Sequence, residues 1–314
     1  MNQHLTQQVF NSGFRPRVRV IAFTVTGLCA ALLWLALVSS VQAQPLLSPT
    51  RLAQLPSGHL LVTDLQGQTV LRWNSNRQIA TGAIKIPGRP VSVAFGWKKL
   101  FVGNELTQSV DVLNRGGQLQ YILGGENFHI PRPSDIALDI EKGWVFVSDT
   151  AGARVLVFDQ KGALLRTLPA EGQTPLYQPT GLTVDPVRGE VLVSDFGKRG
   201  GFSTTAMVRI YDYNGVYKGS ISGKSSDGYG FSRPQGLAVN KQGLIYLVDS
   251  LRSQVLVFDR DTMQGVTTIG EVGKEPGQLL LPLDVLIDEK THDLYVSNNH
   301  NRRIELFSGM GWLP

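Results

Sequence analysis

Arginine side chains at recurring places are the residues of this sequence best suited to binding chemistry. Arg89, Arg132 and Arg233 each stand directly before a proline. Further basic side chains follow short apolar runs that end in Asp or Asn, namely Arg154, Arg252, His300, Arg302 and Arg303. Guanidinium groups bind carboxylates and phosphates through paired N–H donors. If the fold gathers these residues at one end, they predict a surface for an acidic peptide, a carboxylate or a phosphate.

A long insertion supplies a second group of candidate binding residues. Between Asp195 and Val208 lie the twelve residues FGKRGGFSTTAM, where matching segments of the chain hold five. Long loops on a rigid scaffold are where binding residues usually collect. Lys198 and Arg199 supply charge and Phe202 an aromatic contact, although an inert difference in length is the alternative. The GKRGG run lacks the spacing of a phosphate-binding P-loop.

A sequence repeat that occurs six times must position these residues. An apolar run ends in Asp or Asn, a second apolar run follows it, and a proline with a third run precedes it. In the six repeats the first apolar run ends at Asp64, Asn104, Asp149, Asp195, Asp249 and Asn298. The prolines are at positions 49, 90, 133, 179, 234 and 282. The prolines are 41 to 55 residues apart, and repeats of this length with three or four short strands are typical of β-propellers. We therefore predict an all-β, six-bladed β-propeller over residues 44–310, with a β-solenoid as the alternative.

The blade pattern assigns places to the candidate residues. In a four-stranded antiparallel blade, the turns between strands two and three emerge at the same end as the links between blades. That end carries the arginines before prolines and the basic turns. The alternative to a binding surface is a solvated one, whose arginines pair with acids on neighbouring loops: Asp64, Glu105, Asp135 and Glu275.

The Asp or Asn of each repeat is predicted to have a structural role. A short acceptor side chain at a strand end can bond the backbone N–H groups of a tight turn. Arg154 is placed to brace Asp149, and Arg303 to brace Asn298. The sixth repeat lacks a clear fourth strand, so we expect residues 44–48 to pair with the sixth blade and close the ring.

The best-formed repeats resemble a known family. PQGLAVN, IYLVD and VLVF within 234–258, and LYVSNNHNRRIELF at 294–307, resemble the NHL repeat. The resemblance covers roughly residues 49–307 and implies a six-bladed propeller. It does not fix a function, because NHL propellers include RNA-binding modules, protein-interaction platforms, receptor sensor domains and an amidating lyase.

The residues of this sequence give little support for an enzyme. Zinc catalysis needs convergent ligands, commonly His, but the blade pattern separates His59, His129, His292 and His300. The lyase of this family places a ligand His after the blade-opening proline, and no His stands there. No GxSxG nucleophile motif occurs. A calcium-dependent lactonase would need Glu, Asn and Asp around the axis, for which Asn104, Asp135 and Asp284 are candidates by number only. We predict no cofactor and no metal, and lean towards a protein that is not an enzyme.

The N-terminus predicts export. Residues 1–43 hold three arginines and no acid, followed by the apolar run 20–38 and a small-residue cleavage site before Gln44. The run is also long enough to span a bilayer, so a cleaved signal peptide and an uncleaved anchor are both open. Either way the remaining chain is expected in the periplasm or outside the cell. Its only membrane contact would be residues 20–38, if they are not removed.

Charge and cysteine content narrow the function further. Residues 44–314 hold 27 basic and 25 acidic side chains, a net charge of +2, which opposes nucleic-acid binding by bulk electrostatics. The only cysteine is Cys29, inside the apolar run, so the exported part has no thiol chemistry. We therefore expect a monomeric binding protein for a protein or peptide partner in the cell envelope. An enzyme acting on a small ligand at the axis is the alternative, and RNA binding ranks third.

Export is testable at the mature N-terminus. N-terminal sequencing of the protein purified from cells should find Gln44 first, or else an intact chain that only detergent extracts. Recovery of soluble, full-length protein from the cytoplasm would contradict the prediction.

Overall fold

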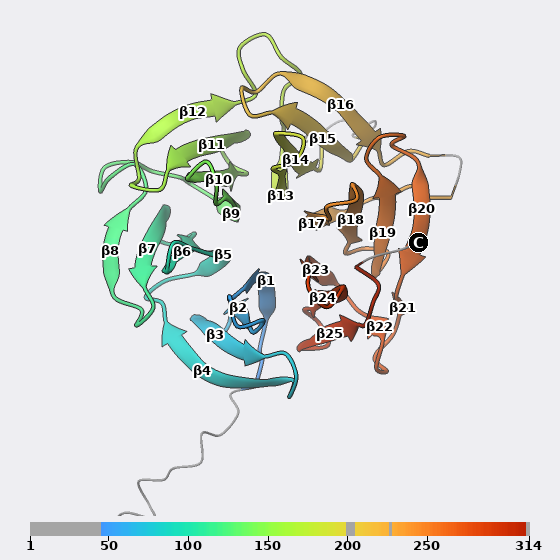
Figure 1. Ribbon diagram of the computed structural model, residues 1–314, viewed down its shortest axis with the longest axis horizontal. Helices are drawn as coiled ribbons and strands as arrows, with labels where there is room; N and C mark the ends of the chain where they lie inside the picture. The colour runs from blue at the N-terminus through green and yellow to red at the C-terminus, as the bar shows by residue number, and fades with distance from the viewer. Residues whose placement is uncertain (1–44, 199–204, 226–227, 312–314) are drawn as a thin grey trace, which may run out of the picture. The chain divides into compact units, whose positions relative to one another are not determined.

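The computed structural model is the predicted all-β, six-bladed propeller. It describes residues 45–198, 205–225 and 228–311. Antiparallel sheets stand around one axis, and the first strand of each sheet lies nearest the centre (Figure 1). The described part contains no helix long and apolar enough to cross a membrane. The predicted signal or anchor at 20–38, and Arg199 and Phe202 of the insertion, lie outside the described residues.

Each blade runs in chain order from its inner to its outer strand. Blade one consists of β1 (Pro49–Gln54), β2 (Leu60–Asp64), β3 (Thr69–Asn74) and β4 (Ile79–Lys85). Blade two consists of β5 (Pro90–Gly96), β6 (Lys99–Asn104), β7 (Ser109–Asn114) and β8 (Leu119–Ile122). Blade three consists of β9 (Pro133–Asp139), β10 (Trp144–Asp149), β11 (Arg154–Asp159) and β12 (Leu164–Leu168). Blade four consists of β13 (Pro179–Asp185), β14 (Glu190–Asp195), β15 (Met207–Asp212) and β16 (Tyr217–Ser222).

The last third of the chain forms two further blades and a small accessory pair of strands. Blade five consists of β17 (Pro234–Val239), β18 (Leu244–Asp249), β19 (Gln254–Asp259) and β20 (Gly265–Ile269). Blade six has three strands, β23 (Pro282–Asp288), β24 (Asp293–Asn298) and β25 (Arg303–Phe307). Between them, β21 (Glu271–Val272) and β22 (Gln278–Leu279) form a short parallel pair.

The core lies between neighbouring blades. Six clusters of buried apolar side chains fill the six spaces between adjacent sheets. Between blades three and four, for example, Phe146 packs on Tyr213 with ring centres 5.1 Å apart. The second strands are buried on both faces, so they read as continuous apolar runs. Many side chains of the outer strands are exposed to solvent, which explains the weaker sequence signal of these strands.

Buried Asp and Asn side chains fix the start of every blade, which confirms and extends their predicted role. Oδ1 of Asp149 accepts the N–H of Gly152 in its own turn at 3.1 Å, and the N–H of Arg132 before β9 at 3.3 Å. Equivalent bonds hold the segments before the other blades, joining Ser48 to Asp64, Arg89 to Asn104, Gln178 to Asp195, Arg233 to Asp249 and Leu280 to Asn298. Each such side chain therefore ties the end of strand two to the segment that opens its blade.

The two predicted bracing arginines differ in outcome. Arg154 Nε lies 3.0 Å from Asp149 Oδ2, as predicted. The predicted bond from Arg303 to Asn298 was wrong. Arg303 pairs instead with Glu305, two residues along the same strand, and bonds the carbonyl of Lys274. A carboxylate on the same strand is the stronger partner for a guanidinium than the Asn298 amide.

The expected pairing of residues 44–48 with blade six was wrong. Blade six keeps three strands, and residues 45–48 form no strand. The N–H groups of Leu47 and Ser48 bond the carboxylate of Asp64 in blade one, at 2.6 and 3.0 Å. Because these donors are committed to Asp64, they cannot pair with β25.

Side chains close the ring between blades six and one instead. Leu46 packs with Tyr295 and Ile304 of blade six in one apolar cluster. The Ser297 hydroxyl donates to the carbonyl of Thr50 at 2.8 Å. The ring therefore closes by face-to-face packing of two sheets, as at the other interfaces.

Removing one capping carboxylate tests its structural role. We expect Asp149→Ala to lower the free energy of unfolding by about 2–4 kcal/mol, because two backbone N–H groups and Arg154 lose their acceptor. Asp149→Asn keeps the Oδ1 acceptor for the two backbone N–H groups but loses the bond to Arg154, so it should cost clearly less than Asp149→Ala. Urea unfolding of both variants measures the difference, and equal losses would contradict the capping role.

Candidate functional site at the axial mouth

The openings of the six blades converge on one cavity of about 280 Å³, which we call the axial mouth. Its wall is made by the second residue of each first strand, namely Thr50, Val91, Ser134, Thr180, Gln235 and Leu283. Its rim carries Arg89, Glu105, Arg132, Phe196 and Arg233. The structure thus brings together the three arginines that stand before prolines.

The guanidinium of Arg51, from β1, forms the floor of the axial mouth. Its Nη2 donates to the carbonyl of Thr180 at 2.9 Å and its Nε to the carbonyl of Ser134 at 3.2 Å. Nη1 donates to the carbonyl of Leu283. One side chain from blade one therefore bonds the first strands of blades three, four and six. Only 6% of the Arg51 side chain is exposed.

Two buried carboxylates flank Arg51 from opposite blades. Asp135 Oδ2 lies 3.4 Å from Arg51 Nε, and Asp284 Oδ1 lies 3.7 Å from Arg51 Nη1. Burial raises the pKa of both, that of Asp284 to about 7, and the positive charge of Arg51 offsets only part of this effect. A single guanidinium neutralises a single carboxylate, so the buried pair keeps a proton well above the usual pKa of an aspartate. The floor is then close to neutral.

The rim is different, because it carries three arginines and a single carboxylate. Arg89 Nη1 and Arg132 Nε lie 3.5 and 3.4 Å from the two oxygens of Glu105. The guanidinium of Arg233 lies 6.0 Å from the ring centre of Phe196, and no ion pair of Arg233 occurs among the described residues. More than half of the Arg89 and Arg132 side chains is exposed, at 54% and 57%. Three positive charges against one leave the rim with a net charge of +2, which favours anions.

The other predicted binding residues lie away from this cavity. Arg154 braces Asp149, and Arg252 Nε lies 4.0 Å from Asp249. His300 is exposed and is not in the lining of the axial mouth. Arg302 lines a separate hollow beside Leu46 and Leu47, because its turn faces the chain segment before blade one. His300 and Arg302 therefore do not line the axial mouth.

The insertion contributes one described candidate. Lys198 is exposed, next to Gly197, whose carbonyl accepts the side-chain amide of Gln178 at 3.0 Å. Gln178 itself lines the axial mouth. The described start of the insertion is thus fixed beside the cavity, and Arg199 and Phe202 follow it in the sequence.

Sequence reasoning missed Arg51, although the repeat contained a signal for it. The third residue of each first strand occupies one place around the axis, and these residues are Arg51, Ser92, Asp135, Gly181, Gly236 and Asp284. An arginine among two aspartates at one register position predicts a buried ion cluster. The glycines make room for it, since a Cβ at Gly236 would lie 1.8 Å from Asp284 Oδ1.

The axial residues do not fit the metal of a lactonase or a lyase. The Arg51 guanidinium lies between Asp135 and Asp284, so the axis already carries a cation between its carboxylates. Backbone N–H groups also donate to these carboxylates: Leu182 to Asp135 Oδ2 at 3.0 Å, and Leu52 to Asp284 Oδ2 at 2.8 Å. The described residues contain no group of three His, Cys, Asp or Glu side chains that suits a metal ion.

Comparison with known proteins supports the repeat and the fold. Residues 231–258 match the NHL repeat family. No curated protein matches the chain. Solved structures share its fold at low identity. A chain of hydrazine synthase from Kuenenia stuttgartiensis superimposes with a TM-score of 0.61 and 15% identity, over 87% of this chain and 99% of that one.

Two further structures illustrate how broadly this fold is used. A gluconolactonase from Xanthomonas campestris has a TM-score of 0.63 and 15% identity, over 85% of this chain and 87% of that one. A chain of the nidogen–laminin complex has a TM-score of 0.57 and 19% identity, over 80% of this chain and 93% of that one. At these identities the likeness concerns the fold alone.

The proton held at the floor predicts a pH dependence of stability. A carboxyl whose pKa is 3.8 in the unfolded chain and about 7 in the folded one takes up a proton on folding between these values. Stability should therefore fall on the order of 2 kcal/mol as pH rises from about 5 to about 8. Asp284→Asn should remove much of this fall in urea unfolding, whereas Glu141→Gln, an exposed control, should not. An unchanged fall in Asp284→Asn would contradict the shared proton.

Proposed function

We propose that this six-bladed propeller is an exported, monomeric binding protein that captures an acidic segment of a protein partner in the cell envelope at its axial mouth. The observation that carries the proposal is the rim charge. Three arginines stand there with a single carboxylate, above a floor whose own charges are balanced. An anion entering the axial mouth therefore meets positive charge at the rim and no opposing negative charge below it.

The capping bonds that build the fold also fix the rim arginines. The backbone N–H of Arg89 bonds Asn104 Oδ1 at 3.0 Å, and that of Arg233 bonds Asp249 Oδ1 at 3.2 Å. The N–H of Arg132 is held by Asp149. Fixed backbones reduce the entropy lost when the guanidinium groups bind an anion.

The size of the axial mouth limits what enters it. A cavity of about 280 Å³ is at the small end for ligand sites and takes one or two side chains rather than a folded surface. Hydroxyls of Thr50 and Ser134 and the amide of Gln235 line it, and Phe196 supplies an apolar contact. We therefore expect an acidic side chain or a chain terminus to enter, while flanking residues of the partner lie over the loops.

The loops around the rim would extend this surface. Exposed Lys198 leads into the insertion, where Arg199 and Phe202 keep the binding role that the sequence suggests. Arg154, Arg252, His300 and Arg302 stand in turns of the same end of the blades and would add long-range attraction rather than direct contact. Charged rim residues mainly set association rate and salt sensitivity, and an aromatic anchor sets residence time.

A small-molecule enzyme at the axis is less well supported. The gluconolactonase shares the fold, but at 15% identity it lends no chemistry to this chain. Asp135 and Asp284 are bonded to Arg51 and to backbone N–H groups beneath the cavity. These bonds leave the two carboxylates as structural groups of the floor.

Binding of a defined acidic probe tests the proposal. A fluorescent decapeptide of Glu and Asp with a free carboxyl end should bind the purified protein, and its Gln and Asn counterpart should not. Arg132→Gln with Arg233→Gln should weaken acidic-peptide binding at least about tenfold at low salt, because two rim charges are lost. Fluorescence anisotropy gives the affinities, and the unfolding free energy should change by less than about 0.5 kcal/mol.

A matched control removes two positive charges at the other end of the blades. Lys241 and Lys290 are exposed in turns between first and second strands. Lys241→Gln with Lys290→Gln should leave peptide affinity within about twofold of the parent. If this pair abolishes binding while the rim pair keeps it, the binding face has been assigned to the wrong end.

A further inference from the structure

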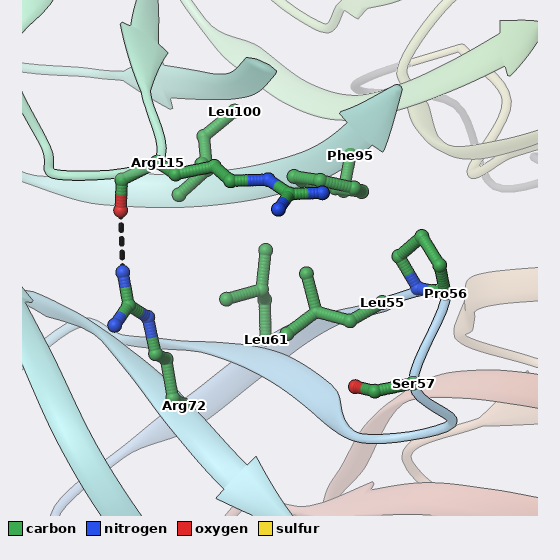
Figure 2. A pocket seen from close by; sticks show the side chains of 8 residues that line it. All are labelled: Leu55, Pro56, Ser57, Leu61, Arg72, Phe95, Leu100 and Arg115. Carbon is green, nitrogen blue, oxygen red and sulfur yellow. Dashed lines mark hydrogen bonds between the residues drawn. The ribbon is translucent and has the colours of Figure 1, made fainter. Parts of the chain in front are cut away.

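A second hollow lies between blades one and two, at the end of the blades opposite to the axial mouth, and we call it the interblade cleft. Its volume is about 620 Å³. Figure 2 shows Leu55 and Leu61 of blade one facing Phe95 and Leu100 of blade two across it. Leu61 and Leu100 belong to the apolar cluster between these two blades, so the cleft opens directly onto the core.

Arg72 explains why the interblade cleft is open. It occupies the register position on the third strand that holds a fully buried Val or Ile in the next four blades, namely Val112, Val157, Ile210 and Val257. Each of those apolar side chains packs in the cluster that faces the following blade. Arg72 is exposed instead, so its position adds no apolar filling between blades one and two.

Arg115 marks the second departure from the repeat. It directly follows the third strand of blade two, as Arg260 directly follows that of blade five. Arg260 reaches back to the preceding blade and makes a buried, bidentate pair with Glu190, at 2.8 and 2.7 Å. The register of strand two places His59 of blade one where blade four has Glu190. Arg115 thus lacks the carboxylate that its counterpart in blade five binds.

The two arginines face the cleft without an acid. None of the residues lining the interblade cleft is acidic, and neither Arg72 nor Arg115 has an ion pair among the described residues. Arg72 donates to the carbonyl of Arg115, and the Arg115 guanidinium lies 5.7 Å from the ring centre of Phe95 (Figure 2). Two unneutralised guanidinium groups therefore stand at the edge of an apolar hollow.

We propose that the interblade cleft binds a small amphipathic organic acid, an aliphatic chain that ends in a carboxylate. The chain would lie against Leu55, Leu61 and Phe95, where apolar surface is removed from water. The carboxylate would supply the negative charge that Glu190 supplies to Arg260, and bind Arg115 and Arg72 through paired N–H donors. A volume of about 620 Å³ lies within the range of small-molecule sites.

Octanoate is the probe for this site, and isothermal calorimetry on the purified protein measures its binding. We expect a dissociation constant below about 1 mM, and binding of the neutral analogue 1-octanol at least about tenfold weaker. Arg72→Gln with Arg115→Gln should weaken octanoate binding at least about tenfold. Arg77→Gln, at an exposed arginine in the next turn of blade one, should leave it within about twofold.

A second pair of variants separates this site from the axial mouth. Arg132→Gln with Arg233→Gln should leave octanoate binding unchanged, although it weakens capture of the acidic peptide. The proposal is overturned if octanoate does not bind, if it binds no better than octanol, or if the Arg132 and Arg233 pair rather than the Arg72 and Arg115 pair removes binding. Phe95→Ala supplies an independent test. Loss of the Phe95 ring from the cleft should weaken octanoate binding and leave the affinity for the acidic peptide unchanged.

Discussion

The rest of the structure depends on the hydrogen bonds that six buried Asp and Asn side chains accept from the segments that open the blades. Buried carboxylates and amides are costly unless their bonding capacity is used, so each one dictates where the chain must pass. Asp149, for example, fixes both its own turn and the backbone of Arg132. Repeated around the ring, this bond sets the start of each inner strand. It thereby places four residues that directly precede prolines at the axial mouth, namely Arg89, Arg132, Gln178 and Arg233.

Charge is divided between two levels at the axis. Below, Arg51 binds three carbonyls and two carboxylates and is almost completely buried, so its role is to join blades. Above, Arg89, Arg132 and Arg233 stay exposed, and only Arg89 and Arg132 pair with Glu105. In the proposed account, stability and binding are therefore carried by different arginines. This separation is why substitutions at the rim are expected to change affinity without unfolding the ring.

The repeat predicted the propeller, its blade boundaries and the capping role of the Asp and Asn residues, because those features are local and recur every 41 to 55 residues. Ring closure was mispredicted, since the N–H groups of Leu47 and Ser48 are bonded to Asp64, which a strand pattern does not reveal. Arg51 was missed because its partners lie 83 to 232 residues away and meet only at the axis. That Arg302 lines a hollow beside Leu46 and Leu47 could not be predicted either, because the repeat does not show how the segment before blade one runs.

The most direct test of the binding account is to locate the acidic peptide on the protein by hydrogen–deuterium exchange. Because the rim arginines are tied to the blade-opening segments, bound peptide should slow exchange in segments that contain Arg132 and Ser134, and Arg233 and Gln235. The turns at 140–143 and 186–189, at the other end of the blades, should exchange as in the free protein. Protection confined to those turns, with no change around Arg132 and Arg233, would contradict the assignment of the axial mouth as the binding site.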